Sequence, residues 1–247
     1  MQNSKQLSII IVNYRSEGYL KGCIASIYNK INNYSFEIIV VNNDPEMVET
    51  RLIASLPAGR DIKIINNKKN LGFGSANNIG AKQAQGEYLL LLNPDTQIET
   101  SNFEEMLERI LKDGNVGAIA PKLVTEEGKV QPWCAGKEPT LKRLIKNNFG
   151  IIESKKIWES QDEISADWVS GAVLLVKKEI FEKVNGFDEN FFMYFEDLDL
   201  CQKIRQAGFG VLYYPRAQVL HYGGQSRESF FQQKKQFFKS MLYFYKR

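Results

Sequence analysis

Cysteine and histidine are scarce in this 247-residue chain, which has three of the former and one of the latter. Cys23, Cys134 and Cys201 stand far apart, and no CxxC pair occurs. An odd number of widely separated cysteines argues against a disulfide framework and against a zinc knuckle. The pattern favours a reducing compartment.

The sequence also lacks a strong excess of one charge and any long apolar run. Its 32 Lys and Arg residues nearly balance 29 Asp and Glu residues. Nucleic-acid-binding domains usually carry a marked basic excess, so we expect no nucleic acid as a partner. No stretch reaches the roughly 20 apolar residues of a membrane span. The run Leu7–Val12 is too short for a signal peptide. We therefore expect a cytoplasmic protein, either soluble or attached peripherally at the inner face of the cell membrane.

Short apolar, β-branched runs alternate with helical patterns over the first hundred residues. Strands are predicted at 7–12, 36–41, 61–66 and 88–92, and helices at 18–29, 45–55 and 75–85. Continuous apolar runs of this length are typical of strands buried on both faces. The alternation predicts an α/β fold with a mostly parallel, doubly wound sheet, in which ligands bind beyond the carboxyl ends of the strands.

The second half of the chain is less regular. Helices are predicted at 101–112, 179–184 and 197–206, strands at 117–123, 169–176, 210–214 and 218–220, and a mobile loop or lid at 125–165 with a short helix near 140–147. No internal repeat and no low-complexity linker interrupts the pattern. A single compact domain is therefore expected.

Polar residues follow each of the four predicted N-terminal strands. They are Asn13 and Tyr14, Asn42 to Asp44, Asn66 and Asn67, and Asn93 to Asp95. Asn and Asp also simply form turns, and any one strand end is explained in that way. Four such ends at one edge of a sheet favour a ligand site instead.

Three acidic or metal-binding features carry chemistry. Asp95, at the end of a buried strand, suits a hard divalent cation bridging a diphosphate, although Asn93-Pro94-Asp95 is also a plausible turn. His221, the single histidine, precedes a Gly-Gly turn and would complete such a site for Mn²⁺ or Mg²⁺, unless it is only a packed residue. Glu196 and Asp197 follow the aromatic run 191–195, where a carboxylate with a tuned pKa can act as a general base. Asp199 is explained by the dipole of the helix that starts there.

The segment 70–78 resembles a dinucleotide fingerprint but is not one. Its sixth position, Asn77, is not glycine, and no acidic residue follows at the required spacing. A helix N-terminus that faces a nucleotide remains a reasonable interpretation.

Several ordered motifs then resemble one family. They are SIIIVNY, IIVVNND, NNKKNLGFGSANNIG, YLLLLNPDT, the stretch from Val169 to Pro215 and VLHYGG. Together they resemble the family 2 glycosyltransferases of the GT-A fold, and in particular the bacterial rhamnosyltransferase-like enzymes. The resemblance implies a Rossmann-like nucleotide-binding half (1–100) and an acceptor-binding, catalytic half (101–229) in one domain, 1–229.

The resemblance also implies roles for individual residues. The family's acidic metal motif falls on Asn93-Pro94-Asp95, where only Asp95 keeps a carboxylate, and its histidine ligand falls on His221. Asp197 matches the catalytic base, and Glu196 would face a sugar. The loop that contains Trp168 and Gly171 matches the segment that closes on donor and acceptor. The implied donor-binding residues are Asn13, Tyr14, Asn42, Asn70, Gly72, Phe73, Asn77, Asn93 and Asp95.

The implied activity is an inverting, metal-dependent sugar transfer that uses Mn²⁺ or Mg²⁺. The donor would be dTDP-rhamnose or a UDP-sugar, and the acceptor a hydroxyl of a glycan or lipid-linked molecule in bacterial surface polysaccharide synthesis. Two alternatives stay open: a non-catalytic carbohydrate-binding or scaffold protein, and a sugar nucleotidyltransferase. The latter needs a Gly-rich basic loop after the first strand, where this chain reads NYRSE.

The C-terminal segment 230–247 has five basic residues and no acidic one. Its aromatic residues can share one face of a helix, which is typical of helices that lie on a membrane surface. The alternative is a helix that packs on the domain and turns its basic face to solvent.

Overall fold

The computed structural model describes residues 6–46, 62–100, 102–223 and 230–247. Its first half contains β1 (Leu7–Asn13), α1 (Glu17–Lys30), β2 (Phe36–Asn42), β3 (Ile62–Asn66), α3 (Phe73–Gln83), β4 (Tyr88–Leu92) and β5 (Thr96–Ile98). Its second half contains α4 (Phe103–Lys112), β6 (Val116–Val124), β7 (Ala135–Gly136), α5 (Leu141–Asn148), α6 (Lys155–Trp158), β8 (Ile164–Ser165), β9 (Trp168–Val169), β10 (Val173–Lys177), α7 (Lys178–Lys183), α8 (Glu196–Gln206), β11 (Gly210–His221) and α9 (Phe230–Lys246). The predicted α/β class is confirmed.

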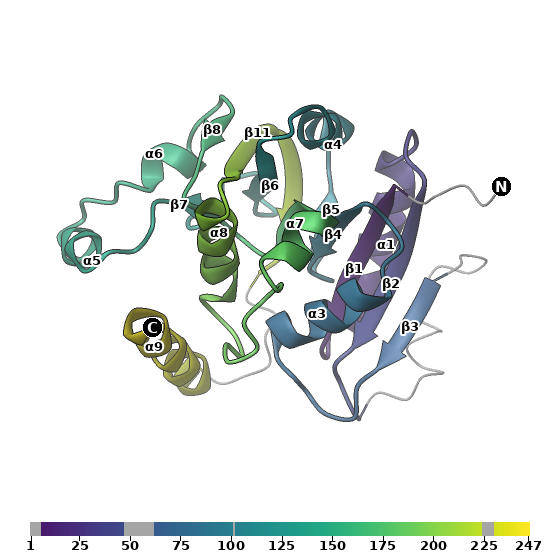
Figure 1. Ribbon diagram of the computed structural model, residues 1–247, viewed down its shortest axis with the longest axis horizontal. Coiled ribbons are helices and arrows are strands. Elements are labelled where there is room, and N and C mark those ends of the chain that lie inside the picture. The colour runs from purple at the N-terminus through teal and green to yellow at the C-terminus, as the bar shows by residue number, and fades with distance from the viewer. Residues whose placement is uncertain (1–5, 47–61, 101, 224–229) are drawn as a thin grey trace.

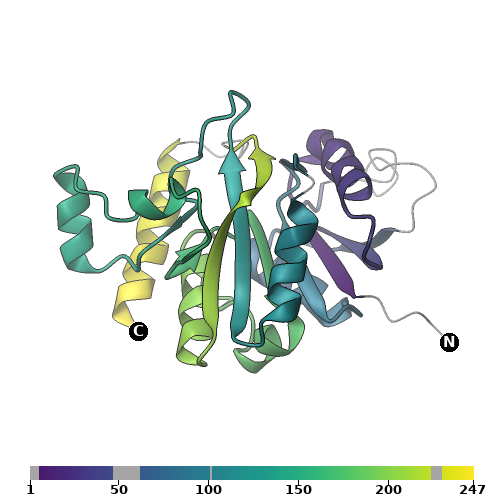
Figure 2. The ribbon, with the colours of Figure 1, turned by 90° about the horizontal axis from the view of Figure 1, so that it is seen from above.

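The main sheet has the strand order β3-β2-β1-β4-β10-β6-β11-β5, and β8 adds to β11. Strands β3, β2, β1 and β4 run parallel, whereas β10 is antiparallel to both of its neighbours, β4 and β6. All seven residues of β1 are buried, as expected of a strand covered on both faces. Helices α3, α7 and α8 lie on one face of the sheet (Figures 1 and 2). Helices α1 and α4 lie on the other, where Glu104 of α4 accepts hydrogen bonds from the backbone just after α1.

The predicted single strand 169–176 is wrong. The chain forms two strands there, because β9 pairs with β7 in a small separate sheet while β10 joins the main sheet. Between them, the N–H of Ser170 donates to Cys134 O and the N–H of Gly171 donates to the side chain of Asp197. These bonds turn the intervening residues into a loop instead of a strand.

The two short strands predicted at 210–214 and 218–220 form one strand, β11, which passes through Pro215. Its pairing with β6 shifts register between Tyr214 and Gln218. A proline, which lacks a backbone donor, is tolerated at such a bulge. The predicted loop 125–165 contains the expected helix as α5, but also β7, α6 and β8. The helix predicted at 45–55 lies almost entirely outside the described residues.

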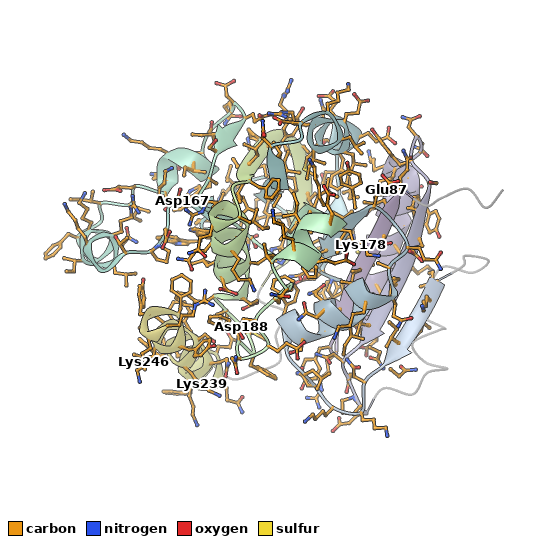
Figure 3. All side chains as sticks on the ribbon, viewed as in Figure 1. Glu87, Asp167, Lys178, Asp188, Lys239 and Lys246 are labelled. Atoms are coloured by element: carbon orange, nitrogen blue, oxygen red, sulfur yellow. The ribbon has the colours of Figure 1, made fainter. Side chains whose placement is uncertain are left out.

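Helix α9 packs on the domain. Phe244 is buried against Phe191 and Phe195, and the hydroxyl of Ser240 donates to Met193 O at 2.7 Å. The basic side chains of Lys239 and Lys246 project away from the body (Figure 3). One face of α9 is therefore committed to the fold. In the described part of the chain, no helix is both long enough and apolar enough to cross a membrane.

Candidate active site

Three asparagines form a row across the carboxyl edge of the parallel strands. Asn13, Asn42 and Asn66 are register partners in β1, β2 and β3. The amide of Asn13 donates to Asn42 Oδ1 at 3.1 Å, and the amide of Asn42 donates to Asn66 Oδ1 at 3.1 Å. Asn13 and Asn42 are buried. Because their amide groups bond to one another, they form a rigid polar floor beneath the strand ends.

A second amide cluster fixes the loop before α3. Asn43 donates to Asn70 Oδ1 at 2.7 Å, and its own Oδ1 accepts the backbone N–H of Leu71 at 3.1 Å. Gly72 has φ +85°, and a Cβ there would lie 2.3 Å from Phe192 O, so only glycine fits. The cluster holds the loop and the start of α3 against the segment that precedes α8.

A cavity of about 360 Å³ lies beside these clusters. The sequence-predicted residues that line it are Tyr14, Asn70, Gly72, Phe73, Asn93, Asp95, Gly171, Glu196, Asp197 and His221. Cavities of this size accommodate small-molecule ligands. The fold thus brings together most of the residues that the sequence singled out.

Four predicted residues do not line this cavity. Asn13 and Asn42 lie in the polar floor, and Asn77 is buried, with its amide donating to Phe73 O at 3.0 Å. Trp168 is also buried and lines a second cavity, of about 840 Å³, on the other side of Asp197. The three asparagines thus support the lining of the first cavity from behind, whereas Trp168 belongs to the wall of the second.

Asp95 and His221 meet because β5 pairs antiparallel with β11. The pairing sets His221 opposite Thr96, next to Asp95. His221 Nε2 lies 3.5 Å from Asp95 Oδ1, and His221 Nδ1 lies 2.7 Å from Gln131 Oε1. An amide oxygen only accepts, so Nδ1 donates to Gln131, and in the neutral form of the imidazole the lone pair is then on Nε2, which faces the carboxylate.

Two acceptors that face each other at this distance suit a cation between them. Imidazole and carboxylate are suitable ligands for Mn²⁺, and a partner on the second ring nitrogen, here Gln131, is typical of metal-binding histidines. Among the described residues, no cluster of three or more His, Cys, Asp or Glu side chains could hold a metal. The donor set fits a cation whose remaining ligands come from a phosphate and water.

Asp197 sits at the start of α8, in a backbone of unusual conformation. Tyr194 and Phe195, just before the helix, both have positive φ, at +69° and +70°. Non-glycine residues in this region are strained, and such strain concentrates at functional sites. Asp197 Oδ2 accepts the N–H of Gly171 at 3.0 Å, and Oδ1 accepts the N–H of Leu198 at 2.8 Å.

Burial raises the pKa of Asp197 despite these hydrogen bonds. Burial also raises the pKa of Glu196 to about 8, and the charge of Asp197 adds to that shift. Glu196 Oε2 is buried and has no hydrogen-bond partner among the described residues. An unpaired buried oxygen is costly, so this carboxyl group suits a ligand that donates a hydrogen bond.

Asp199 differs from these two carboxylates. It is fully buried, and it pairs with Lys203 at 3.3 Å and with Arg247 of the C-terminus. Its charge is thus balanced within the protein. Asp199 does not line either cavity beside Asp197.

Sequence reasoning missed two residues that shape the site. Asn43 lines the cavity and holds the loop 70–72, and Gln131 orients His221. Asn43 was visible as part of a polar strand end. Gln131 had no signal, because it comes from the irregular segment between β6 and β7.

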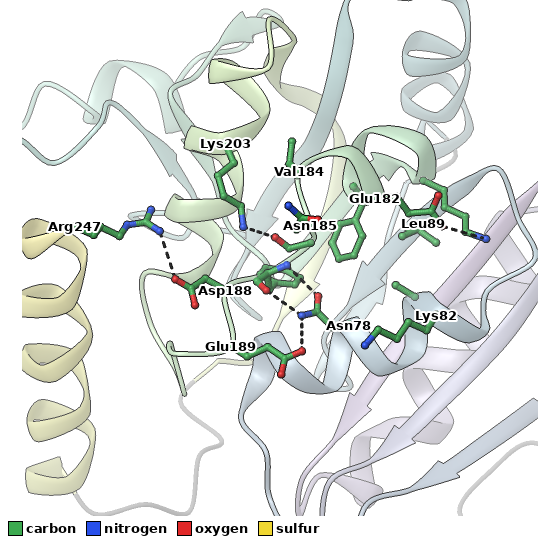
Figure 4. Close-up of a pocket in the computed structure, with 15 residues that line it drawn as sticks. Asn78, Lys82, Leu89, Glu182, Val184, Asn185, Asp188, Glu189, Lys203 and Arg247 are labelled. Carbon is green, nitrogen blue, oxygen red and sulfur yellow. Dashed lines mark hydrogen bonds and ion pairs between the residues drawn. The ribbon is translucent and has the colours of Figure 1, made fainter.

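A third cavity, of about 620 Å³, contains none of the predicted site residues. Figure 4 shows Lys203 and Arg247 of its lining bonded to neighbours within the protein. Lys203 donates to Gly186 O, Arg247 lies 3.6 Å from Asp188, and Lys178 lies 3.8 Å from Glu182. The catalytic and metal-binding candidates that the sequence predicts, Asp95, Asp197 and His221, all line the first cavity.

Comparison with protein families agrees with this geometry. Residues 8–183 match the family described as glycosyl transferase family 2. Residues 159–223 also match the family described as N-terminal domain of galactosyltransferase. The first match covers most of the chain, including the polar strand ends and the loop with Gly171.

Two curated relatives match over nearly the whole chain. The chain is 28% identical to rhamnosyltransferase WbbL of Escherichia coli over 232 residues, which is 90% of this chain and 86% of the relative. It is 25% identical over 239 residues to N-acetylglucosaminyl-diphospho-decaprenol L-rhamnosyltransferase of Mycobacterium tuberculosis, which is 89% of this chain and 77% of the relative.

Solved structures show the same fold. A mannosyltransferase of Pyrobaculum calidifontis in complex with GDP-Man and Mn²⁺ aligns with a TM-score of 0.63 at 15% identity, over 92% of this chain and 59% of that one. GalNAc-T7 with UDP, GalNAc and Mn²⁺ aligns with a TM-score of 0.63 at 18% identity, over 90% of this chain and 44% of that one. The chain belongs to glycosyl transferase family 2 and is a glycosyltransferase with the GT-A fold.

Proposed function

We propose that this glycosyltransferase moves a sugar, with inversion, from a nucleoside-diphosphate donor to a hydroxyl of a glycan or lipid-linked acceptor in bacterial surface polysaccharide synthesis. The observation that carries the proposal is the shared cavity, which Asp95, His221 and Asp197 all line. An inverting transfer needs one base and a means to stabilise the leaving diphosphate, and these side chains match both needs. The names of the two rhamnosyltransferase relatives support rhamnose as the transferred sugar. We propose dTDP-rhamnose as the donor, with a UDP-sugar as the alternative.

We assign donor binding to the wall of the first cavity that lies at the ends of the parallel strands. Tyr14, Asn70, Gly72 and Phe73 are proposed to contact the nucleoside. Asn13, Asn42 and Asn77 are proposed to hold that wall from behind, because they are buried and bonded to their neighbours. Asn93 lines the cavity beside Asp95 and is proposed as a neutral neighbour of the diphosphate.

Asp95 and His221 are proposed to hold Mn²⁺ or Mg²⁺ together with the donor diphosphate. The cation would offset the negative charge that grows on the leaving nucleoside diphosphate. Gln131 is proposed to favour the tautomer of the neutral imidazole that has its proton on Nδ1, which leaves Nε2 as a ligand.

Asp197 is proposed to accept the proton of the attacking acceptor hydroxyl. Its raised pKa brings the carboxylate nearer to the operating pH, which favours general-base catalysis. The Gly171 N–H fixes one oxygen of this carboxylate. Glu196, whose Oε2 lacks a partner among the described residues, is proposed to bind a hydroxyl of the acceptor sugar. Trp168 and Gly171 are proposed to form the wall near the acceptor.

The test uses donor binding and donor turnover together. Thermal shift is measured with UDP, dTDP and GDP and their sugars, each with and without Mn²⁺, because a ligand that binds the native state raises its stability. Slow release of nucleoside diphosphate from one donor sugar is then measured in the wild type and in Asp197→Asn. Binding of no nucleotide, or binding without any release, would overturn the proposal and favour a carbohydrate-binding scaffold.

A further inference from the structure

The segment 191–195 leads the chain into the start of α8, where the candidate base lies. Phe192 O accepts the backbone N–H of Phe73, the first residue of α3, at 3.0 Å. The next carbonyl, Met193 O, accepts the side-chain hydroxyl of Ser240 on α9 at 2.7 Å. The entry to α8 is thus bonded to the donor side of the site through one peptide group and to α9 through the next.

The last two residues of this segment keep a backbone conformation that large side chains disfavour. Tyr194 and Phe195 have φ of +69° and +70°. Bulky residues at positive φ persist only where the surrounding structure holds them there. The ring of Tyr194 packs against Phe237 of α9, with centroids 5.8 Å apart, and the ring of Phe195 packs against Phe237 and Phe244, at 5.3 Å and 5.5 Å. Helix α9 therefore supplies contacts that hold the left-handed turn.

The contacts of α9 fall on both sides of Asp197, and the helix lies beside α8 (Figures 1 and 2). Ser240, Phe244 and Arg247 are spaced by four and three residues, so they face the same neighbour. Ser240 and Phe244 contact the segment before Asp197. Arg247 pairs with Asp199 in the first turn of α8, after Asp197. The backbone that carries the candidate base is thus held from α9 at both ends.

Ser240 makes the polar contact of this set that lies before the candidate base. It is 3% exposed, so its hydroxyl is shielded from solvent. Met193, whose carbonyl it holds, lines the first cavity together with Tyr194 and Asp197. A rotation of the Met193 peptide would therefore move the cavity wall and the start of α8 together.

We propose that Ser240 is a positioning residue for Asp197. Its hydroxyl holds the Met193 peptide and with it the left-handed entry to α8, which sets where the carboxylate meets the attacking hydroxyl. The inference rests on the proposed function, because it takes Asp197 as the base. It gives α9 a part in the rate of transfer, in addition to its packing on the domain.

Two matched changes on α9 test the inference. Ser240→Ala and Tyr243→Phe each remove one hydroxyl that bonds α9 to the domain, since Tyr243 donates to Asp188 Oδ2 at 2.9 Å. Each variant loses one hydrogen bond, so both should lower Tm by a similar, small amount. Ser240→Ala alone releases the chain just before Asp197.

Ser240→Ala should lower kcat by about tenfold or more, because a small displacement of a reacting group is costly. The KM for the donor should stay at the wild-type value, and Tyr243→Phe should keep both constants. The rate is the release of dTDP from dTDP-rhamnose with Mn²⁺, and of UDP from UDP-glucose for the alternative donor. In this step water forms a bond to the anomeric carbon, the bond to the diphosphate breaks, and Asp197 takes the proton.

Hydrogen exchange follows the same segment without any donor. The N–H of Asp199 donates to Phe195 O at 2.9 Å, so its exchange reports whether the first turn of α8 stays formed. We expect this N–H to exchange about tenfold faster in Ser240→Ala than in Tyr243→Phe, because local opening limits its exchange. Equal exchange in the two variants would overturn the inference.

The kinetic outcomes separate the inference from its foundation. Equal kcat in Ser240→Ala and Tyr243→Phe, in a protein whose release depends on Asp197, would remove the role of Ser240 alone. A raised donor KM at unchanged kcat would place Ser240 in donor binding and would also overturn the inference. If the wild type releases no nucleoside diphosphate from either donor, or Asp197→Asn releases it at the wild-type rate, the proposed function fails and the role of Ser240 falls with it.

Discussion

The backbone N–H of Gly171 donates to Oδ2 of Asp197 at 3.0 Å and so ties the loop between β9 and β10 to the first turn of α8. Ala172 O, in the same loop, accepts a hydrogen bond from the backbone N–H of Asn93 at 2.8 Å. One short loop thus connects the candidate base with the strand end that presents Asp95. The positions of the two chemical groups are coupled through backbone hydrogen bonds.

Asp197→Asn should abolish most of the transfer but not donor binding. The amide keeps the shape of the side chain and removes the proton acceptor, so turnover should fall by ~10²–10⁴-fold. The measurement is steady-state transfer, together with thermal shift by the nucleotide.

Asp199→Asn is the matched control for that change. Asp199 is buried and paired with Lys203 and Arg247, so its loss should lower the free energy of unfolding by about 1–3 kcal/mol with little effect on turnover of the folded enzyme. Near-normal transfer by Asp197→Asn, or a folded but inactive Asp199→Asn, would contradict the assignment.

Gln131→Leu should weaken metal-dependent donor binding although Gln131 is not a proposed ligand. Without the amide oxygen, His221 Nδ1 loses its partner, and a loss of this kind typically costs ~10–100-fold in metal affinity. Calorimetry measures the affinity for a nucleoside diphosphate with and without Mn²⁺. Asp95→Ala and His221→Ala are measured in the same way and should lose the effect of Mn²⁺ on this affinity. If all three variants keep it, the metal site lies elsewhere.

Gly171→Ala should slow transfer more than it affects stability. The new Cβ would lie 3.1 Å from Phe73 Cε1 and 3.4 Å from Asp197 Cβ, so the loop or the ring must move. A displacement beside the reacting groups should cost on the order of tenfold to a hundredfold in turnover. Gly114→Ala is the control, because nothing lies within 4 Å of a Cβ there. Equal activity of the two variants would refute the coupling.

The stability of the unliganded protein should fall as pH rises from about 4.5 to 8. Glu196 has a folded-state pKa of about 8 against an ordinary value of 4.5, so between these values the folded state binds more protons than the unfolded state. The free energy of unfolding therefore decreases with pH in this window. Glu196→Gln should flatten the dependence and gain stability relative to the wild type at pH 8.5. Urea unfolding at several pH values measures this, with exposed Glu99→Gln as control. If Glu196→Gln keeps the wild-type pH dependence of the free energy of unfolding, Glu196 is not the cause of that dependence.

Arg247→Ala should loosen α9. The guanidinium lies 3.6 Å from Asp188 and also pairs with Asp199, and it stacks over the rings of Phe191 and Phe244. We expect a lower Tm and faster proteolysis within α9, whereas Lys246→Ala, on the exposed side, should behave as the wild type. Identical protease sensitivity of the two variants would show that Arg247 does not contribute to holding α9 on the domain.

Sequence alone determined the parallel half of the fold. Runs such as Leu7–Val12 and Tyr88–Leu92 are short, continuously apolar and followed by polar turn residues, which is typical of strands buried on both faces. The polar residues at their ends followed from the same pattern, because the carboxyl ends of parallel strands meet at one edge. Asp197 and His221 were candidates from their residue types and positions, and the family resemblance assigned them the roles of base and metal ligand.

Tertiary structure decided what those residues meet. The β5–β11 pairing brings Asp95 next to His221, and the break between β9 and β10 gives Asp197 its Gly171 partner; neither pairing has a local signature in the sequence. The contact between Gln131 and His221 depends on the long-range packing of an irregular segment. Local periodicity reports which face of an element is buried, whereas contacts between distant segments are set only when the chain closes on itself.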